Sequence, residues 1–374
     1  MKMLFTSLAE KPHKLFFFGG MVQAMVTMMV LLLHVQDVSY TILALSSFHA
    51  YTLIFAVFSQ FFFGFLCTMF PRFLAVPEIE AKEYQPPFLL LNGAALLFTV
   101  AAYGSGVLTL LATAGMAAAY LMVVRILGHC YRQSEVTERA DVNWMVLALV
   151  AGGVSQLLFL ISFANPEWIS MRRMAVDSGF FLFLFMLIIT VSQKMIPFFT
   201  EGKVTGYRAN RSRYFLHSMA VLLLLKVLFS AASLNSFGLI DGGLLVITLR
   251  ELIRWRLPIR QVPPMLWVLY LALFWIPLGF LLLLIEGISP LLSDTGGWMF
   301  EKGPLHLISI GFFTTLLMGF GSRIILGHAG EKPVADRYTI GLFWFLQGIV
   351  LVRLVAGMMV SSGGAILSGS PSRH

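Results

Sequence analysis

The sequence predicts an all-α membrane protein, a polytopic transmembrane helical bundle of about eleven spans. Of its 374 residues, 58% are hydrophobic and only 12% are charged, whereas soluble domains average about 25% charged residues. Apolar runs of about 20 residues recur along the chain, each long enough to cross about 30 Å of hydrocarbon as a helix. Helix is the expected state of these runs, because lipid offers no hydrogen-bond partners to an open backbone.

The expected spans follow these apolar runs in chain order. They are 15–33, 48–70, 87–104, 107–127, 143–163, 174–197, 214–234, 237–253, 264–287, 304–325 and 338–360. The connections after the third and seventh spans are very short, which predicts antiparallel hairpins. Residues 1–360 are expected to form a single transmembrane domain. The Gly/Ser-rich segment 361–374 is too polar to span and is predicted to be a disordered tail.

The basic residues predict the orientation of the bundle. The net charge is +8, but the basic residues lie between spans rather than in one patch, which argues against nucleic acid as a partner. Most of them fall at the N-terminus and in every second loop. The opposite loops and the tail carry only Arg172, Arg173, Lys302 and Arg373. By the positive-inside rule, the N-terminus is cytoplasmic.

With this orientation, the histidines sort by depth. His49 and His306 begin the second and tenth expected spans near the outer face, so they can share one metal. His328 lies at the other end of the tenth span, about 33 Å from His306 along a helix. Neutral imidazole is a common ligand of metals and of haem iron. The alternative for each histidine taken alone is a plain hydrogen-bonding role near the lipid headgroups.

Charged residues within the spans add further candidates. Arg353 lies about two-thirds of the way across the last expected span, where an arginine is costly unless a carboxylate pairs with it. A haem propionate would serve as that carboxylate, and the alternative is that the side chain extends to the outer interface. Lys226 is expected to pair with Asp241 of the neighbouring span as a structural contact.

Two expected spans carry patterned faces. The first, 48–70, has a stripe that is small and polar compared with its Phe-rich remainder, and this stripe is expected to face the bundle interior. Its members are His49, Ala56, Gln60, Gly64 and Cys67. The second, 304–325, places Gly311, Thr315 and Gly319 at four-residue spacing, which lets helices approach closely.

Four blocks of the chain resemble, in order and spacing, segments of one membrane-protein family. FHAYTLIFAVFSQFFFGFLCTMFPRF resembles WHAHEMLFGF…GFLLTAVPNW, and SQKMIPFFT resembles GRVIPAFT. VLYLALFWIPLGFLLL resembles a later LH…W…LG span, and PLHLISIGFFTTLLMGFGSRIILGHAGEK resembles ALHALTVGAIGTMTLAVMTRASLGHTGR. The chain thus resembles the NnrS family of haem- and copper-containing membrane proteins associated with the response to nitric oxide.

The resemblance implies a haem-binding, multi-pass protein of the bacterial inner membrane, linked to nitric oxide and nitrosative stress. It implies His49 and His306 as iron ligands, Arg353 as a propionate partner, and His328 as a ligand at a second, inner site. Aromatic residues of the second span are expected to line the haem pocket. No Cys-x-x-Cys-His occurs, so the haem is expected to be non-covalent haem b.

The chain also departs from the family pattern. Two histidines of the pattern are replaced by Tyr51 and Tyr270, and a glutamate is replaced by Thr52. These changes argue against copper, because nitrogen ligands have been exchanged for phenols and a hydroxyl. A twelfth span, usual in the family, has no counterpart after residue 360.

Two other functions remain open at this point. A small-solute transporter would use a broken helix and a charge near the membrane midplane, which Pro277 with Gly279, and Lys226, fit weakly. A reductase related to the haem-copper enzymes would also bind haem, but its binuclear centre needs several clustered histidines. Whether the protein turns over a substrate, senses a gas or scavenges it is not decided by the sequence.

Overall fold

The computed structural model describes residues 8–36, 41–165, 167–236, 238–292 and 300–368. Within these ranges it contains helices and no strands, which confirms the all-α prediction. Contacts divide the chain into two compact units. Unit 1 comprises Met1–Thr190 with Ser230–Ala232, and unit 2 comprises Val191–Phe229 with Ser233–His374. That residues 1–360 act as a single domain stays a prediction.

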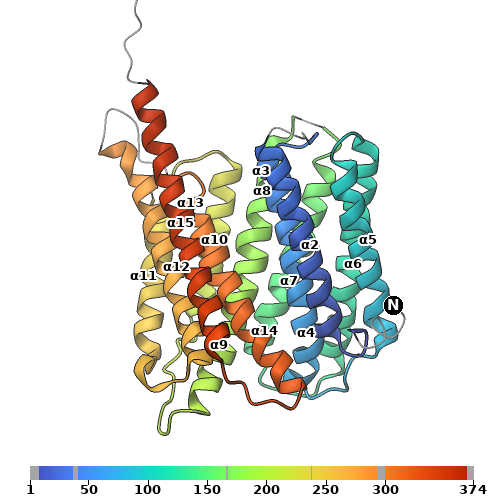
Figure 1. Ribbon diagram of the computed structural model, residues 1–374, viewed down its shortest axis with the longest axis vertical. Helices are drawn as coiled ribbons and strands as arrows, with labels where there is room; N and C mark the ends of the chain where they lie inside the picture. The colour runs from blue at the N-terminus through green and yellow to red at the C-terminus, as the bar shows by residue number, and fades with distance from the viewer. Residues whose placement is uncertain (1–7, 37–40, 166, 237, 293–299, 369–374) are drawn as a thin grey trace, which may run out of the picture. The chain divides into compact units, whose positions relative to one another are not determined.

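Unit 1 is built from the N-terminal helices, coloured blue to green in Figure 1. They are α2 (Pro12–Val35), α3 (Leu45–Thr52), η1 (Leu53–Phe58), α4 (Ser59–Phe73), α5 (Ala81–Ala101), α6 (Gly106–Gln133), α7 (Ala140–Ile161), α8 (Ile169–Asp177), η2 (Ser178–Phe185) and the start of α9 (Met186–Glu201), which belongs to unit 2 from Val191 onward. Helix α2 packs on α4 and η1, and α7 packs on η2. The expected hairpin of the third and fourth spans is confirmed, because α5 packs along α6 after a short link.

Unit 2 is built from the C-terminal helices, yellow to red in Figure 1. They are α10 (Phe215–Ala231), α11 (Leu239–Trp255), η3 (Ile259–Gln261), α12 (Pro264–Ile288), η4 (Ser289–Leu291), α13 (Gly303–His306), η5 (Leu307–Thr314), α14 (Thr315–His328) and α15 (Arg337–Ser368). Helix α12 packs on α11, on η5 and on α14. Helix α13 packs on α15, so the start of the tenth expected span rests on the last helix.

The described residues include nine helices that are long and apolar enough to cross a membrane. The chain is therefore a polytopic membrane protein. The expected spans 214–234 and 237–253 coincide with α10 and α11, which have 17 residues each and are not among those nine. The total of about eleven spans and the cytoplasmic N-terminus stay predictions. Helix α15 continues into the predicted tail, and residues 369–374 lie outside the described residues.

Three of the long helices contain a π-helical segment, in which backbone hydrogen bonds reach five residues instead of four. Each segment directly follows a short α-helix: η1 follows α3, η2 follows α8, and η5 follows α13. Hydroxyl groups bond the carbonyls of these wide turns. Ser59 Oγ donates to the carbonyl of Ile54 at 2.8 Å, and Thr314 Oγ1 donates to the carbonyl of Ser309 at 2.9 Å. Because π-helical turns occur often at functional sites, they direct attention to the helices that carry His49 and His306.

The small and polar stripe of the second span is buried, as expected, with Ala56 and Gln60 both 0% exposed. The Phe-rich remainder of the span is buried as well, since Phe55 and Phe63 are 1% and 0% exposed. The span is covered on all sides by α2, α5, α6 and η2. A helix that is apolar all round is buried all round, and this one forms the centre of unit 1.

The small-residue face of the tenth span packs closely on α12, which confirms that prediction. A Cβ atom on Gly311 would lie 2.5 Å from Cγ of Trp275, and one on Gly319 would lie 2.5 Å from Cδ2 of Leu269. Both distances are below van der Waals contact, so a larger residue at either position requires Trp275 or Leu269 to shift.

Candidate functional site

The His306 side chain is held in one arrangement by its own helix. Its Nδ1 lies 2.7 Å from the carbonyl oxygen of Lys302, one turn earlier. Because a carbonyl only accepts, Nδ1 carries the proton and Nε2 carries the lone pair. Histidine ligands of metals are commonly oriented in this way, by a hydrogen bond from the other ring nitrogen. His306 is half-buried, directly before the π-helical segment η5.

Arg353 stands on α15, the helix that packs on α13. Helix α15 also lies close to the residue Phe300, which precedes α13. A Cβ atom on Gly357 would lie 2.7 Å from the carbonyl oxygen of Phe300. The half-buried Arg353 lies one turn before Gly357 on the same helix, and one of its guanidinium nitrogens would lie 3.6 Å from that Cβ atom. Within the described residues, Arg353 has no hydrogen-bond or ion-pair partner in the protein. Unit 2 thus brings together two predicted site residues, an oriented imidazole and an arginine that lacks a carboxylate.

His49 lies in α3, half-buried, one turn before the π-helical segment η1. Stacked rings fix this turn: Phe48 stacks on Phe98 with centroids 5.7 Å apart, and Tyr51 stacks on Phe159 with centroids 3.8 Å apart. The aromatic side chains beside His49 are therefore engaged with other rings of unit 1. Their role in a haem pocket, and the sharing of one metal by His49 and His306, stay predictions.

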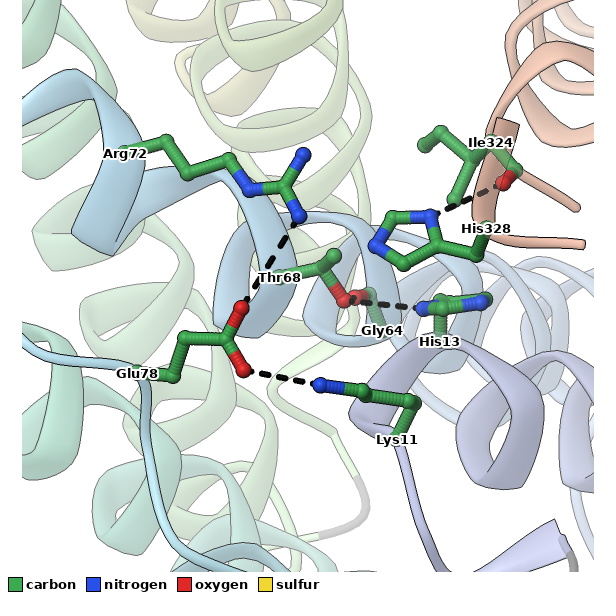
Figure 2. A network of polar contacts seen from close by, with 8 residues as sticks. All are labelled: Lys11, His13, Gly64, Thr68, Arg72, Glu78, Ile324 and His328. Atoms are coloured by element: carbon green, nitrogen blue, oxygen red, sulfur yellow. Dashed lines mark hydrogen bonds and ion pairs between the residues drawn. The ribbon is translucent and has the colours of Figure 1, made fainter. Parts of the chain in front are cut away.

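His328 ends α14, at the opposite end of the continuous helix Gly303–His328 from His306. This confirms that the two cannot share one metal. Its Nδ1 lies 2.9 Å from the carbonyl oxygen of Ile324 (Figure 2), the same ring arrangement as in His306. Five residues earlier, the guanidinium carbon of Arg323 lies 4.1 Å from the ring centroid of Phe199. Sequence reasoning missed this cation–π contact, although both residues belong to the quoted blocks.

The two tyrosines that replace histidines of the family pattern are buried and hydrogen-bonded. The Tyr51 hydroxyl donates to Oε1 of Gln156 at 2.5 Å, and the Tyr270 hydroxyl lies 2.7 Å from Oγ1 of Thr200. Each is at most 1% exposed. These phenols serve packing and hydrogen bonding inside their own units, and the expectation that copper is not bound stays a prediction.

Among the residues that the structure describes, no three His, Cys, Asp or Glu side chains lie close enough to hold a bare metal ion. Haem iron needs fewer ligands from the protein, since the porphyrin supplies four nitrogen atoms and the protein supplies axial ligands. An oriented histidine beside a guanidinium therefore fits haem better than it fits an isolated ion.

The predicted pair of Lys226 and Asp241 is confirmed. The ammonium nitrogen lies 2.7 Å and 2.9 Å from the two carboxylate oxygens. Asp241 is 5% exposed, and the pair links α10 to α11. Asp177 accepts a hydrogen bond of 2.6 Å from Ser230 Oγ within unit 1. These contacts connect one helix to another. Arg353 forms no hydrogen bond or ion pair of this kind with the described residues.

Figure 2 shows a polar network at the end of unit 1 where α2 begins. His13 is 0% exposed, and its Nδ1 lies 3.3 Å from Thr68 Oγ1. Nearby, the carboxylate of Glu78 accepts a 2.8 Å contact from Lys11 and lies 3.8 Å from Arg72. His13 therefore ties α2 to α4, which is a structural role.

A sequence model of the protein family described as NnrS protein matches residues 7–370. This match covers nearly the whole chain and includes each of the residues described above. No curated protein matches the chain.

Proposed function

Since the chain belongs to the NnrS family, we propose that it is a haem b-binding, multi-pass protein of the bacterial inner membrane that acts in the response to nitric oxide and nitrosative stress. His49 and His306 are the proposed iron ligands, Arg353 is the proposed partner of a haem propionate, and His328 is the proposed ligand of a second site. The positive-inside rule places His49 and His306 at the periplasmic face.

The observation that carries the proposal is the pairing of His306 with Arg353. An imidazole with its lone pair on Nε2 can bind iron. A guanidinium within a membrane helix is costly without an anion, and none of the described residues supplies a carboxylate to Arg353. Haem can serve both side chains, since its iron binds an imidazole nitrogen and its propionates pair with a guanidinium.

When bound, haem iron supplies direct binding of nitric oxide. The residues of the chain then determine access to the metal: two histidine ligands on one iron favour electron transfer, whereas an open position favours gas binding. His306 keeps its ring orientation through Lys302. Copper is not part of the proposal, because Tyr51 and Tyr270 are engaged in their own hydrogen bonds.

An absorption spectrum of the purified protein tests the proposal. We expect the oxidised protein to show a Soret band, and the dithionite-reduced protein to show sharp b-type bands that shift when nitric oxide is added. Haem bands that do not shift when nitric oxide is added would confirm that the protein binds haem. They would contradict nitric oxide binding at the iron and favour a role in electron transfer. A colourless preparation from haem-replete cells would reject the proposal.

A further inference from the structure

Unit 1 contains a row of buried polar side chains between α2 and the central helix formed by α3, η1 and α4. The row consists of Gln23, Thr27, Thr52 and Gln60, and it is called the polar row below; the half-buried Asn92 of α5 bonds Gln60 at its end. Gln23 and Thr52 are 1% exposed, and Thr27 and Gln60 are 0% exposed. Four buried polar side chains are unusual at the centre of an apolar bundle, because burial of a polar group without a partner is unfavourable.

Two contacts establish the register of α2 on the central helix. A Cβ atom on Gly19 would lie 2.3 Å from Gln60 Oε1, and His13 lies 3.3 Å from Thr68. Later residues of α2 thus meet earlier residues of the central helix, as in an antiparallel pair.

Continuing this register toward the His49 end places Gln23 level with Ala56, and Thr27 level with the turn of Tyr51 and Thr52, since the π-helical segment η1 offsets the central helix by about one residue. Helix α2 does pack on η1 there. Ala56 has the smallest side chain of this strip and is 0% exposed. The hydroxyl of Thr27 donates to the carbonyl of Gln23 at 2.8 Å, which directs it along α2.

Two donors of the polar row have no partner in the protein. Gln23 Nε2 and Thr52 Oγ1 are both buried, and neither has a hydrogen-bond partner among the described residues. By contrast, Gln60 and Asn92 bond each other through their amides at 3.3 Å and 3.1 Å. Buried polar groups without a protein partner are normally satisfied by ordered water, which needs two to four polar contacts.

The polar row ends at the Gln60–Asn92 pair. One turn further, a Cβ atom on Gly64 would lie 3.0 Å from Phe16 Cβ and 3.2 Å from the His13 Cα. The backbones of α2 and α4 touch at this point and leave no space for a polar path. His13 is thereby separated from the row.

We propose that the polar row binds a short chain of water molecules, which runs from the His49 end of unit 1 to the Gln60–Asn92 pair. The row contains no charged side chain, so it suits neutral water and protons relayed by water rather than ions. Thr52 lies one helical turn from His49. In this one respect the inference rests on the proposed function: if His49 holds haem iron, the row supplies water and protons to that site.

Cysteine accessibility tests for water in the row without reference to haem. In the purified protein, with Cys67→Ala and Cys130→Ala as background, we would introduce Thr52→Cys or Gln23→Cys. The matched control is Ala119→Cys, at a 0% exposed position on α6. Since thiol reactivity follows water access and thiolate formation, methanethiosulfonate ethylammonium is expected to label both row positions about tenfold faster than the control. Equal rates at the three positions would overturn the proposal.

A second measurement distinguishes water from a dry, unpaired hydroxyl. Thr52→Val keeps the side-chain shape and removes the hydroxyl. If Thr52 Oγ1 binds water, the Thr52→Val variant loses the hydrogen bond between this hydroxyl and the water. The Tm is then expected to fall. If Oγ1 is dry, removal of an unpaired polar atom raises the Tm, and the proposal fails. Neither experiment measures haem, so either can fail while the spectrum supports the proposed function, and the reverse also holds.

Discussion

The helix that carries His49 and the helix that carries His306 share a local order but differ in their surroundings. Both start as a short α-helix, pass through a π-helical segment and continue as a long α-helix. Around His49 the neighbouring rings are stacked and the helix is buried on all sides. Beside His306, Arg353 has no anionic partner among the described residues. The same local pattern thus lies among stacked aromatic rings in unit 1 and near an arginine without an anionic partner among the described residues in unit 2.

Replacing the two histidines tests this contrast most directly. His306→Ala and His49→Ala are each expected to lose haem or to change its coordination, because each removes a proposed iron ligand. The reduced absorption spectrum and the haem content of the purified variants measure the effect. Full retention of haem in both variants would contradict the ligand assignment. Loss in His306→Ala alone would assign ligation to unit 2.

His217→Ala is the matched control for these variants. Its Nδ1 lies 3.2 Å from the carbonyl oxygen of Arg213, so its ring has the same local arrangement as that of His306, but it is exposed. Haem content should be unchanged. His13→Ala should also keep its haem, because His13 bonds Thr68 and lies beyond the closed contact at Gly64.

Breaking the ion pair between α10 and α11 gives the next largest expected effect, which is on the free energy of unfolding. Lys226 has a carboxylate partner, whereas Arg353 has none among the described residues. Lys226→Met removes one partner of a pair that is largely buried, so we expect the free energy of unfolding to fall by about 3 kcal/mol. The double variant Lys226→Met, Asp241→Leu should recover most of this loss, because no unpaired carboxylate remains. A double variant as unstable as the single one would contradict this account.

Arg353→Gln should behave differently from Lys226→Met in the haem-free protein. Because Arg353 has no protein partner in the described part of the chain, its removal is expected to leave the Tm unchanged or slightly raised. In haem-loaded protein the same variant should weaken haem retention. The Tm values of both variants, with and without haem, make the comparison. A large loss of stability without haem would show that Arg353 is a structural residue.

The close packing of the tenth span predicts a smaller effect on stability. Gly311→Ala places a Cβ atom against Trp275, and overpacking of this kind costs about 1–3 kcal/mol. Gly327→Ala, on the same helix, meets nothing within 4 Å and is the control. Chemical denaturation followed by Trp fluorescence measures both. Equal stabilities would mean that α12 and η5 are less tightly held than the structure shows.

The smallest expected effect is on the pH dependence of stability, through the hydrogen bond of Asp336 at the start of α15. Asp336 precedes α15, and its carboxylate accepts a 2.8 Å bond from the Thr339 backbone N–H, which lowers the pKa of Asp336. A lowered folded-state pKa means that this stabilisation is present at neutral pH and is lost as the pH falls through that pKa. Asp336→Asn should flatten the acid side of the Tm profile of the protein between about pH 5 and pH 2. An unchanged profile would contradict the assignment.

Sequence patterns predicted the features that depend on local composition. Hydropathy located the helices, because each apolar run must satisfy its own backbone in lipid. The small-residue spacing of Gly311 and Gly319 and the pair of Lys226 with Asp241 were also predictable, since helical periodicity and a short connection limit the possible partners. The chain therefore determined its class, most of its helix positions and the candidate ligands by itself.

The tertiary structure decided what depends on contacts between distant segments. Tyr51 bonds Gln156, 105 residues away, and Trp275 donates to Gln347, 72 residues away. Neither partner is visible in a local pattern, because many helix arrangements satisfy the same hydropathy. For the same reason, only the packed structure shows that the central helix of unit 1 is buried all round, that the polar row contains donors without protein partners, and that Arg353 stands beside His306.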